Sequence, residues 1–169
     1  MELTIRKGKT EDAEKLIYFL KEVRRGMENQ EWLYLDTPEE VHWAMAEGTM
    51  QLWLAMDGER IAGIFDILIP GLAEYNYGYD LGLAQDELLR VIHMDTAAVH
   101  PVYRGRGLQK RLMQEAEKYA SEIGGRILLT TVHPDNCYSL NNILQQGYTI
   151  EKQLPKYGSV RCILRKDLP

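Results

Sequence analysis

The stretch AAVHPVYRGRGLQ, residues 97–109, decides the fold of this chain. Its apolar beginning predicts the end of a strand, and the proline predicts where that strand stops. The two glycines predict a turn, and the apolar residues at helical spacing from Leu108 onward predict a helix. The first N–H groups of such a helix have no partners within it. With the helix dipole, they favour an anion such as a pyrophosphate.

Two common nucleotide motifs do not fit this turn. A P-loop has Lys and then Ser or Thr after its last glycine, whereas Leu108 follows Gly107. A dinucleotide-binding fingerprint needs a third glycine, and Lys110 occupies that position. From the glycines alone, a plain surface turn with solvated Arg104 and Arg106 is an equally good interpretation.

A second block of sequence adds to this pattern. Residues 126–132 predict a buried strand, which is followed by a turn and a short helix that Asn136 caps. The two blocks together resemble the acyl-CoA-binding region of the GNAT superfamily of N-acetyltransferases. In that family an Arg or Gln, two residues, a Gly, one residue and a Gly or Ala surround the CoA pyrophosphate. Arg104 and Gly107 match this motif, and Gln109 departs from it.

The family also has an Asn eleven positions before the glycine of a Gly-Phe or Gly-Tyr pair, and Asn136 matches it. The resemblance implies that acetyl-CoA is the cosubstrate and that no metal is needed. It implies an oxyanion donor near Ala97 and pairing of the pantetheine arm with the strand at Ala98 and Val99. The implied cofactor-binding residues are Ala97, Ala98, Val99, Arg104, Gly105, Arg106, Gly107, Leu108, Gln109, Lys110, Asn136 and Ser139.

The remaining periodicity agrees with an α/β fold in which a central mixed sheet carries helices on both faces. We expect one domain over residues 1–169, with elements in the order β-α-α-β-β-β-α-β-α-β-β. The predicted strands cover residues 3–6, 50–56, 60–69, 91–100, 126–132, 149–154 and 159–165. The predicted helices begin at Thr10, Thr37, Leu108 and after Asn136.

Acetyl transfer to an amine requires that the amine lose a proton, and the strand before the glycine turn offers two candidate bases. His93 and Asp95 alternate on one face of this strand, and the family places base residues at these two positions. A structural hydrogen-bonded pair, or one side chain turned into the core, is an alternative interpretation. The resemblance places a Tyr that protonates the CoA thiolate at residue 143, where this chain has Ile143. Tyr138 or a water is the remaining candidate for that acid.

Two segments are candidates for the acceptor pocket. A segment of about 20 residues between Pro70 and Leu89 is rich in tyrosine and glycine, and loops of this length are usually functional or disordered. The alternative is a surface excursion without a ligand. The second segment lies between the first two predicted helices. The predicted substrate-binding residues are Trp32, Tyr34, Tyr75, Tyr77 and Tyr79.

Composition narrows the class of protein. The chain has 20 basic and 25 acidic side chains and a net charge of −5, which argues against a nucleic-acid binder. It has no apolar run long enough for a membrane span and no secretory leader, and two cysteines without metal spacing predict reduced thiols in the cytoplasm. We expect a monomer or homodimer.

Three functions remain open on the sequence alone. We expect an acetyl-CoA-dependent N-acetyltransferase that acts on a small-molecule amine or on a peptide or protein amine. The alternatives are a catalytically weak acyl-CoA-binding sensor or regulatory subunit, and an acyltransferase that uses a longer acyl chain or an oxygen acceptor.

Overall fold

The computed structural model describes residues 2–169, which form two compact units. Unit 1 comprises residues 2–68 and Thr96–Glu117, and unit 2 comprises Ile69–Asp95 and Lys118–Pro169. Two elements, β4 (Val91–Val99) and α4 (Leu108–Glu122), begin in one unit and end in the other. The strand order of the sheet is β1-β2-β3-β4-β5-β7-β6. Strand β4 pairs with β5 in parallel, whereas the pairs β1–β2, β2–β3, β5–β7 and β6–β7 are antiparallel. The predicted mixed α/β fold is therefore confirmed.

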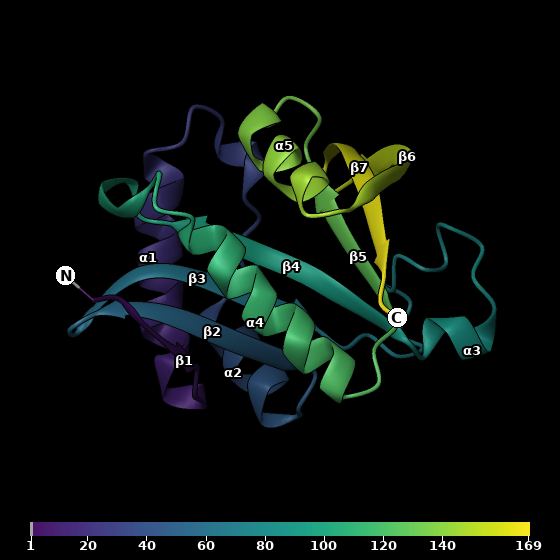
Figure 1. The fold of residues 1–169 in the computed structure, drawn as a ribbon, viewed down its shortest axis with the longest axis horizontal. Coiled ribbons are helices and arrows are strands. Elements are labelled where there is room, and N and C mark those ends of the chain that lie inside the picture. The colour runs from purple at the N-terminus through teal and green to yellow at the C-terminus, as the bar shows by residue number, and fades with distance from the viewer. Residues whose placement is uncertain (1) are drawn as a thin grey trace. The chain divides into compact units, whose positions relative to one another are not determined.

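Unit 1 is built on the antiparallel strands β1 (Thr4–Lys7), β2 (Met50–Asp57) and β3 (Arg60–Leu68). Asp57 and Gly58 form the tight turn between β2 and β3, and Gly58 has the left-handed φ of 59° that this turn requires. Helices α1 (Ala13–Arg25) and α2 (Pro38–Ala46) lie behind these strands, and α4 up to Glu117 lies in front of them (Figure 1). The apolar faces of α1 and α2 pack on β2 and β3 in a core that includes Leu16, Leu20, Val41, Leu52, Leu54 and Ile64.

The helix starts of unit 1 follow from local hydrogen bonds. Thr37 caps α2 at the predicted helix start through a reciprocal box: its hydroxyl accepts the Glu40 N–H, and the Glu40 carboxylate accepts the Thr37 N–H. The predicted cap at Thr10 takes another form, because Thr10–Asp12 is a short 3₁₀ turn, η1, that leads into α1. The Asp12 carboxylate accepts the Lys9 N–H and a bidentate pair of hydrogen bonds from Arg6, which joins the start of α1 to β1.

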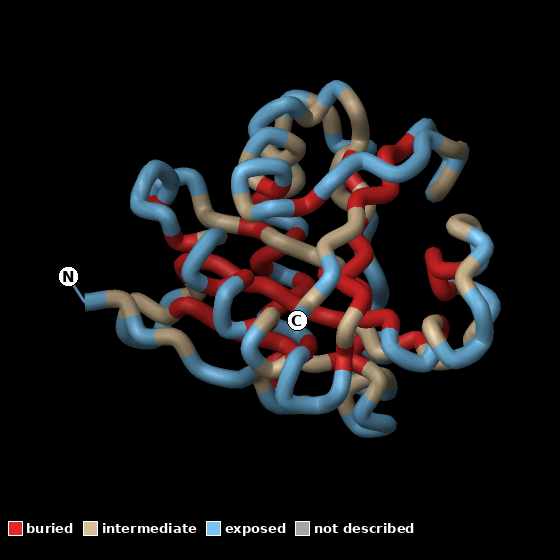
Figure 2. Tube along the Cα trace, turned by 45° about the vertical axis from the view of Figure 1, so that its right-hand side comes forward, coloured by how far each residue is buried: buried red, intermediate tan, exposed pale blue. Residues whose placement is uncertain are grey.

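Unit 2 contains the first half of β4 together with β5 (Ile127–Val132), β6 (Thr149–Lys156) and β7 (Ser159–Asp167). The β4–β5 ladder joins residues 91–93 to residues 127–129, and β5 continues along its whole length against β7. Val91, Ile127, Leu129, Ile163 and Tyr77 form a buried cluster in this unit. Buried stretches follow the inner strands, whereas the edge strands β1 and β6, the turns and the outer faces of the helices are mostly exposed (Figure 2).

The segment between β3 and β4 is an ordered series of turns that ends in a short helix, α3 (Gln85–Leu88), which the sequence analysis did not predict. The buried side chain of Asn76 holds it together. Its amide nitrogen donates to the carbonyl oxygens of Gly71 and Leu88, and its Oδ1 accepts the Gly78 N–H at 2.8 Å. A buried polar group with all these partners fixes backbone conformation, so this segment is not a loose surface excursion. Residues 2–169 contain no helix that is both long and apolar enough to cross a membrane.

Candidate active site

The predicted phosphate turn lies in unit 1, between η3 (Pro101–Tyr103) and α4. Gly105 and Gly107 both have left-handed backbone conformations, with φ of 74° and 67°, which explains why glycine occupies these positions. A Cβ atom added at either glycine would meet no atom within 4 Å. The space beside the start of α4 is therefore open to a ligand that approaches the backbone closely.

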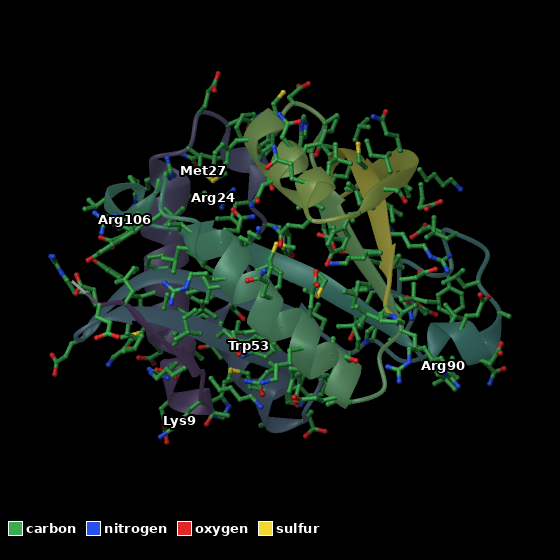
Figure 3. All side chains as sticks on the ribbon, viewed as in Figure 1. Lys9, Arg24, Met27, Trp53, Arg90 and Arg106 are labelled. Atoms are coloured by element: carbon green, nitrogen blue, oxygen red, sulfur yellow. The ribbon has the colours of Figure 1, made fainter. Side chains whose placement is uncertain are left out.

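The rigid surroundings of the turn hold it in place. The Tyr103 hydroxyl donates to Oδ2 of Asp57 at 2.6 Å, and this bond raises the pKa of Tyr103. Leu108 is buried at the start of α4. The exposed Arg106 extends from the turn with its guanidinium 5.8 Å from the Tyr103 ring (Figure 3). Arg104 and Lys110 are also exposed, so the turn presents three cationic side chains to solvent.

The end of β4 leads directly into this turn. Within unit 1, the His100 N–H donates to the Ala62 carbonyl, and the Thr96 N–H donates to the Asp66 carboxylate at 3.2 Å. Gly63 allows β3 to approach closely here, because a Cβ at this position would lie 3.2 Å from the Ala98 carbonyl oxygen. Ala98 is buried, and Ala97, Val99 and Gln109 are half-buried.

The second predicted cofactor block lies in unit 2. Asn136 is the N-cap of α5 (Cys137–Gln145), and its side chain accepts the Ser139 N–H at 3.3 Å. The small side chain of Ser139 stands half-buried in the first turn of this helix. Ile143 is buried, whereas Tyr138 is 71% exposed.

His93 is turned into the core of unit 2, with 1% of its surface exposed. Its Nε2 accepts the Tyr77 N–H at 3.1 Å, and its ring stacks on the Tyr77 ring with 3.9 Å between centroids. Burial, and to a smaller extent the charge of Lys156, lowers the pKa of His93 to about 3. The imidazole is therefore neutral at physiological pH, with its acceptor nitrogen already engaged.

Asp95 is half-buried in β4 and belongs to a polar group that the sequence analysis did not find as a group. Its carboxylate raises the pKa of Tyr75 and Tyr77, although burial is the larger cause for both phenols. It also acts on the buried Arg161 of β7, whose pKa is lowered by burial and raised by nearby negative charge. The Tyr77 hydroxyl is hydrogen-bonded to the Tyr157 hydroxyl.

Arg161 and Tyr157 are the two members of this group that the sequence analysis missed. The only signal in the sequence was an arginine between Val160 and Cys162, within an otherwise apolar run of the last strand. Alternation in β7 allows such a side chain to face either solvent or core, and only the fold decides which.

The five predicted acceptor-binding residues are distributed over both units. Trp32 and Tyr34 follow α1 in unit 1, where Trp32 is half-buried and Tyr34 is 60% exposed. In unit 2, Tyr75 and Tyr79 are about half exposed, and Tyr79 donates to the Leu72 carbonyl. Tyr77 differs from them because it is buried against His93. Residues 2–169 contain no cluster of three His, Cys, Asp or Glu side chains that could hold a metal ion.

Comparison with known proteins identifies the class to which this fold belongs. The sequence model of the acetyltransferase (GNAT) family matches residues 16–148. No curated protein sequence matches the chain significantly. The chain is a member of the GNAT acetyltransferase family, as the two sequence blocks predicted.

Solved structures show the same fold. NAA60 of Arabidopsis thaliana in complex with acetyl-CoA matches with a TM-score of 0.79 and 17% identity, over 99% of each chain. The PaiA N-acetyltransferase of Thermoplasma acidophilum in complex with coenzyme A matches with a TM-score of 0.69 and 18% identity, over 99% of this chain and 100% of that one. A GNAT-family acetyltransferase of Streptococcus pneumoniae matches with a TM-score of 0.75 and 21% identity, over 99% and 100%. At these identities the likeness concerns the fold.

Proposed function

We propose that this protein transfers an acetyl group from acetyl-CoA to a primary amine by direct attack of the amine on the thioester. The bond from the amine nitrogen to the acyl carbon forms, the bond from that carbon to sulfur breaks, and CoA leaves as a thiolate. Family membership supports acetyl transfer, and the open glycine turn before α4 supports the binding of a pyrophosphate. The cofactor-binding residues remain those that the sequence predicts on β4, the glycine turn and the start of α5.

The single observation that carries the mechanism is the contrast between His93 and Asp95. His93 is buried, and its Nε2 accepts a backbone N–H, so it has no free lone pair for a substrate proton. Asp95 stands two residues further along the same strand, is half-buried, and carries a charge that acts on its neighbours. We therefore assign proton acceptance to Asp95 and a positioning role to His93, which holds the backbone of Tyr77.

The timing of proton transfer follows from the pKa values of the two groups. An alkylammonium has no lone pair, so it loses one proton to Asp95, directly or through one water, before the neutral amine attacks the thioester. Its pKa of about 10.4 against about 4 for a carboxylic acid makes this first transfer unfavourable but reversible, and Asp95 passes the proton on to solvent. The nitrogen is far more acidic once it bonds to the acyl carbon, and its second proton leaves by the same route while the thiolate departs. A thiol pKa of about 8.5 makes this departure possible without a strong acid, which is consistent with Ile143 at the position of the usual Tyr.

The test is a CoA-release assay with purified protein and a panel of primary amines, in which acetylated products are identified by mass spectrometry. Asp95→Asn is expected to lower kcat/KM by roughly 10²–10⁴ at neutral pH, and the loss should shrink at high pH, where the amine is neutral. Acetyl-CoA affinity should stay unchanged. Asp86→Asn, on the exposed side of α3, is the matched control and should keep full activity. Acetyl-CoA binding without CoA release for any amine would instead indicate a sensor.

A further inference from the structure

Arg161 is a buried cation whose hydrogen-bonding capacity is only partly used. Only 7% of the Arg161 surface is exposed, and the Arg161 Nε donates to the Thr131 hydroxyl at 3.2 Å. Its Nη1 is buried and finds no hydrogen-bond partner among residues 2–169. Its guanidinium also lies over the Tyr157 ring, with 5.7 Å between Cζ and the ring centroid. In the described part of the chain, Arg161 therefore has no carboxylate ion pair of its own.

Such an arrangement is costly to the fold. A buried guanidinium loses its hydration, and an unused donor adds the cost of an unmade hydrogen bond. The loss of hydration lowers the pKa of Arg161, and the nearby phenols and Asp95 only oppose this effect. Two other arginines bind carboxylates, and one of them, Arg6, pairs with Asp12 through two nitrogens. Arg165, four residues further along the same strand, binds Asp167 through two nitrogens at 2.7 and 3.2 Å. Costly polar arrangements of this kind cluster at binding sites, where a ligand completes them.

We propose that Arg161 binds a carboxylate of the acceptor, an inference that rests on the proposed function. The substrate is then an amino acid or a similar small molecule with both an amine and a carboxylate. The charges of the site suit a zwitterion: Asp95 interacts with the ammonium end, and Arg161 interacts with the anionic end. A carboxylate matches the planar guanidinium through two parallel hydrogen bonds. A phosphate dianion would meet stronger repulsion from Asp95, whose negative charge already acts on Arg161 and both phenols.

Tyr157 covers this receptor in the free protein. It stands in the turn between β6 and β7 with a left-handed φ of 54°, it is 51% exposed, and its ring contacts the guanidinium. A carboxylate that reaches Nη1 takes the place of this ring. Because Tyr157 lies at a hairpin turn rather than inside a strand, its side chain can swing toward solvent without breaking the β6–β7 ladder, at the cost of its hydrogen bond to Tyr77. The proposal therefore includes a movement of Tyr157 when the acceptor binds.

The experiment compares matched acceptors. Each of the common amino acids, and a series of unbranched ω-amino acids, is assayed beside its carboxamide, its decarboxylated amine and its phosphonate analogue. The wild-type enzyme is expected to prefer the carboxylate over the carboxamide by roughly 10- to 200-fold in kcat/KM, which corresponds to one hydrogen bond to a charged group. Arg161→Gln should remove this preference mainly through KM and leave the slow carboxamide reaction within about threefold. Arg165→Gln is the matched control on the same strand and should keep the preference.

Each outcome has one meaning. Equal rates with amino acids, carboxamides and plain amines would overturn the assignment of Arg161 but leave acetyl transfer to amines intact. A preference for the phosphonates would also overturn it. A uniform loss with every acceptor in Arg161→Gln would show a structural role only. If no amine of any kind is acetylated, the proposed function itself fails. If Arg161→Gln does not fold, the wild-type preference for the carboxylate over the carboxamide still decides whether the acceptor's carboxylate is bound.

Discussion

The buried histidine provides a quantitative prediction about the stability of the fold. His93 is neutral in the folded chain, with its pKa lowered to about 3, whereas an unfolded histidine has a pKa of about 6.5. A group whose folded pKa lies below its unfolded pKa binds more protons in the unfolded state. The fold is therefore fully stable with respect to His93 above about pH 6.5 and loses stability as the pH falls from there toward 3.

The size of this loss at mild acidity depends little on the folded pKa. At about pH 5, roughly 1.5 pH units below the unfolded value, one histidine that stays neutral in the fold costs about 2 kcal/mol. His93→Gln removes the titration and retains a side-chain oxygen that can accept the Tyr77 N–H. The variant is expected to be less stable than wild type near pH 7.5, and this difference should shrink by about 2 kcal/mol near pH 5.

Urea unfolding of both proteins at the two pH values measures this double difference. His42→Gln, at an exposed position of α2, is the matched control and should follow wild type at both values. Lys156→Gln should leave most of the effect, because burial is the larger cause of the shift and the Lys156 charge the smaller. A double difference below about 0.5 kcal/mol for His93→Gln would refute a neutral, buried His93.

Three further predictions use other features. Acetyl-CoA at about 100 times its Kd should raise the free energy of unfolding by about 2.7 kcal/mol, as measured by urea unfolding, and NAD should have no such effect. Gly107→Val should weaken acetyl-CoA binding in calorimetry far more than Arg106→Ala, because it disturbs a left-handed backbone at the turn, and the smaller Arg106→Ala effect should fade with added salt. Asp12→Asn should destabilise the fold at neutral pH by losing the Arg6 ion pair. Because this pair lowers the pKa of Asp12, the difference from wild type should be present above about pH 4 and disappear as the pH falls further, which thermal melts at several pH values would check.

The local patterns were sufficient for most of the secondary structure. The helix start predicted at Thr37 and the break predicted between the strands 50–56 and 60–69 are both confirmed, because each depends on hydrogen bonds and dihedral preferences within a few residues. The glycine turn and Asn136 predicted the family by the same route. Each of these features depends on a short segment of sequence, and tertiary packing does not change it.

The segment between β3 and β4 shows a structure that local sequence patterns do not predict. Its glycines and tyrosines predicted a long loop, but a single buried side chain, Asn76, organises it through three backbone partners. The sequence likewise predicted that Tyr75, Tyr77 and Tyr79 bind the acceptor together. The fold separates them, because Tyr77 stacks on a histidine sixteen residues away while the other two stay half exposed. No spacing rule relates such distant residues.

By itself, the sequence determined the class of fold, the turn before α4 and the pair of candidate bases on β4. Only the tertiary structure distinguished the two candidates, because burial and the Tyr77 N–H act on His93 from another segment and leave Asp95 half-exposed. Only the tertiary structure also brought Arg161 into the same polar group, with one guanidinium nitrogen unused. The physical reason is that desolvation and charge depend on what surrounds a side chain in space, and the chain assembles those surroundings from strands and turns far apart in sequence.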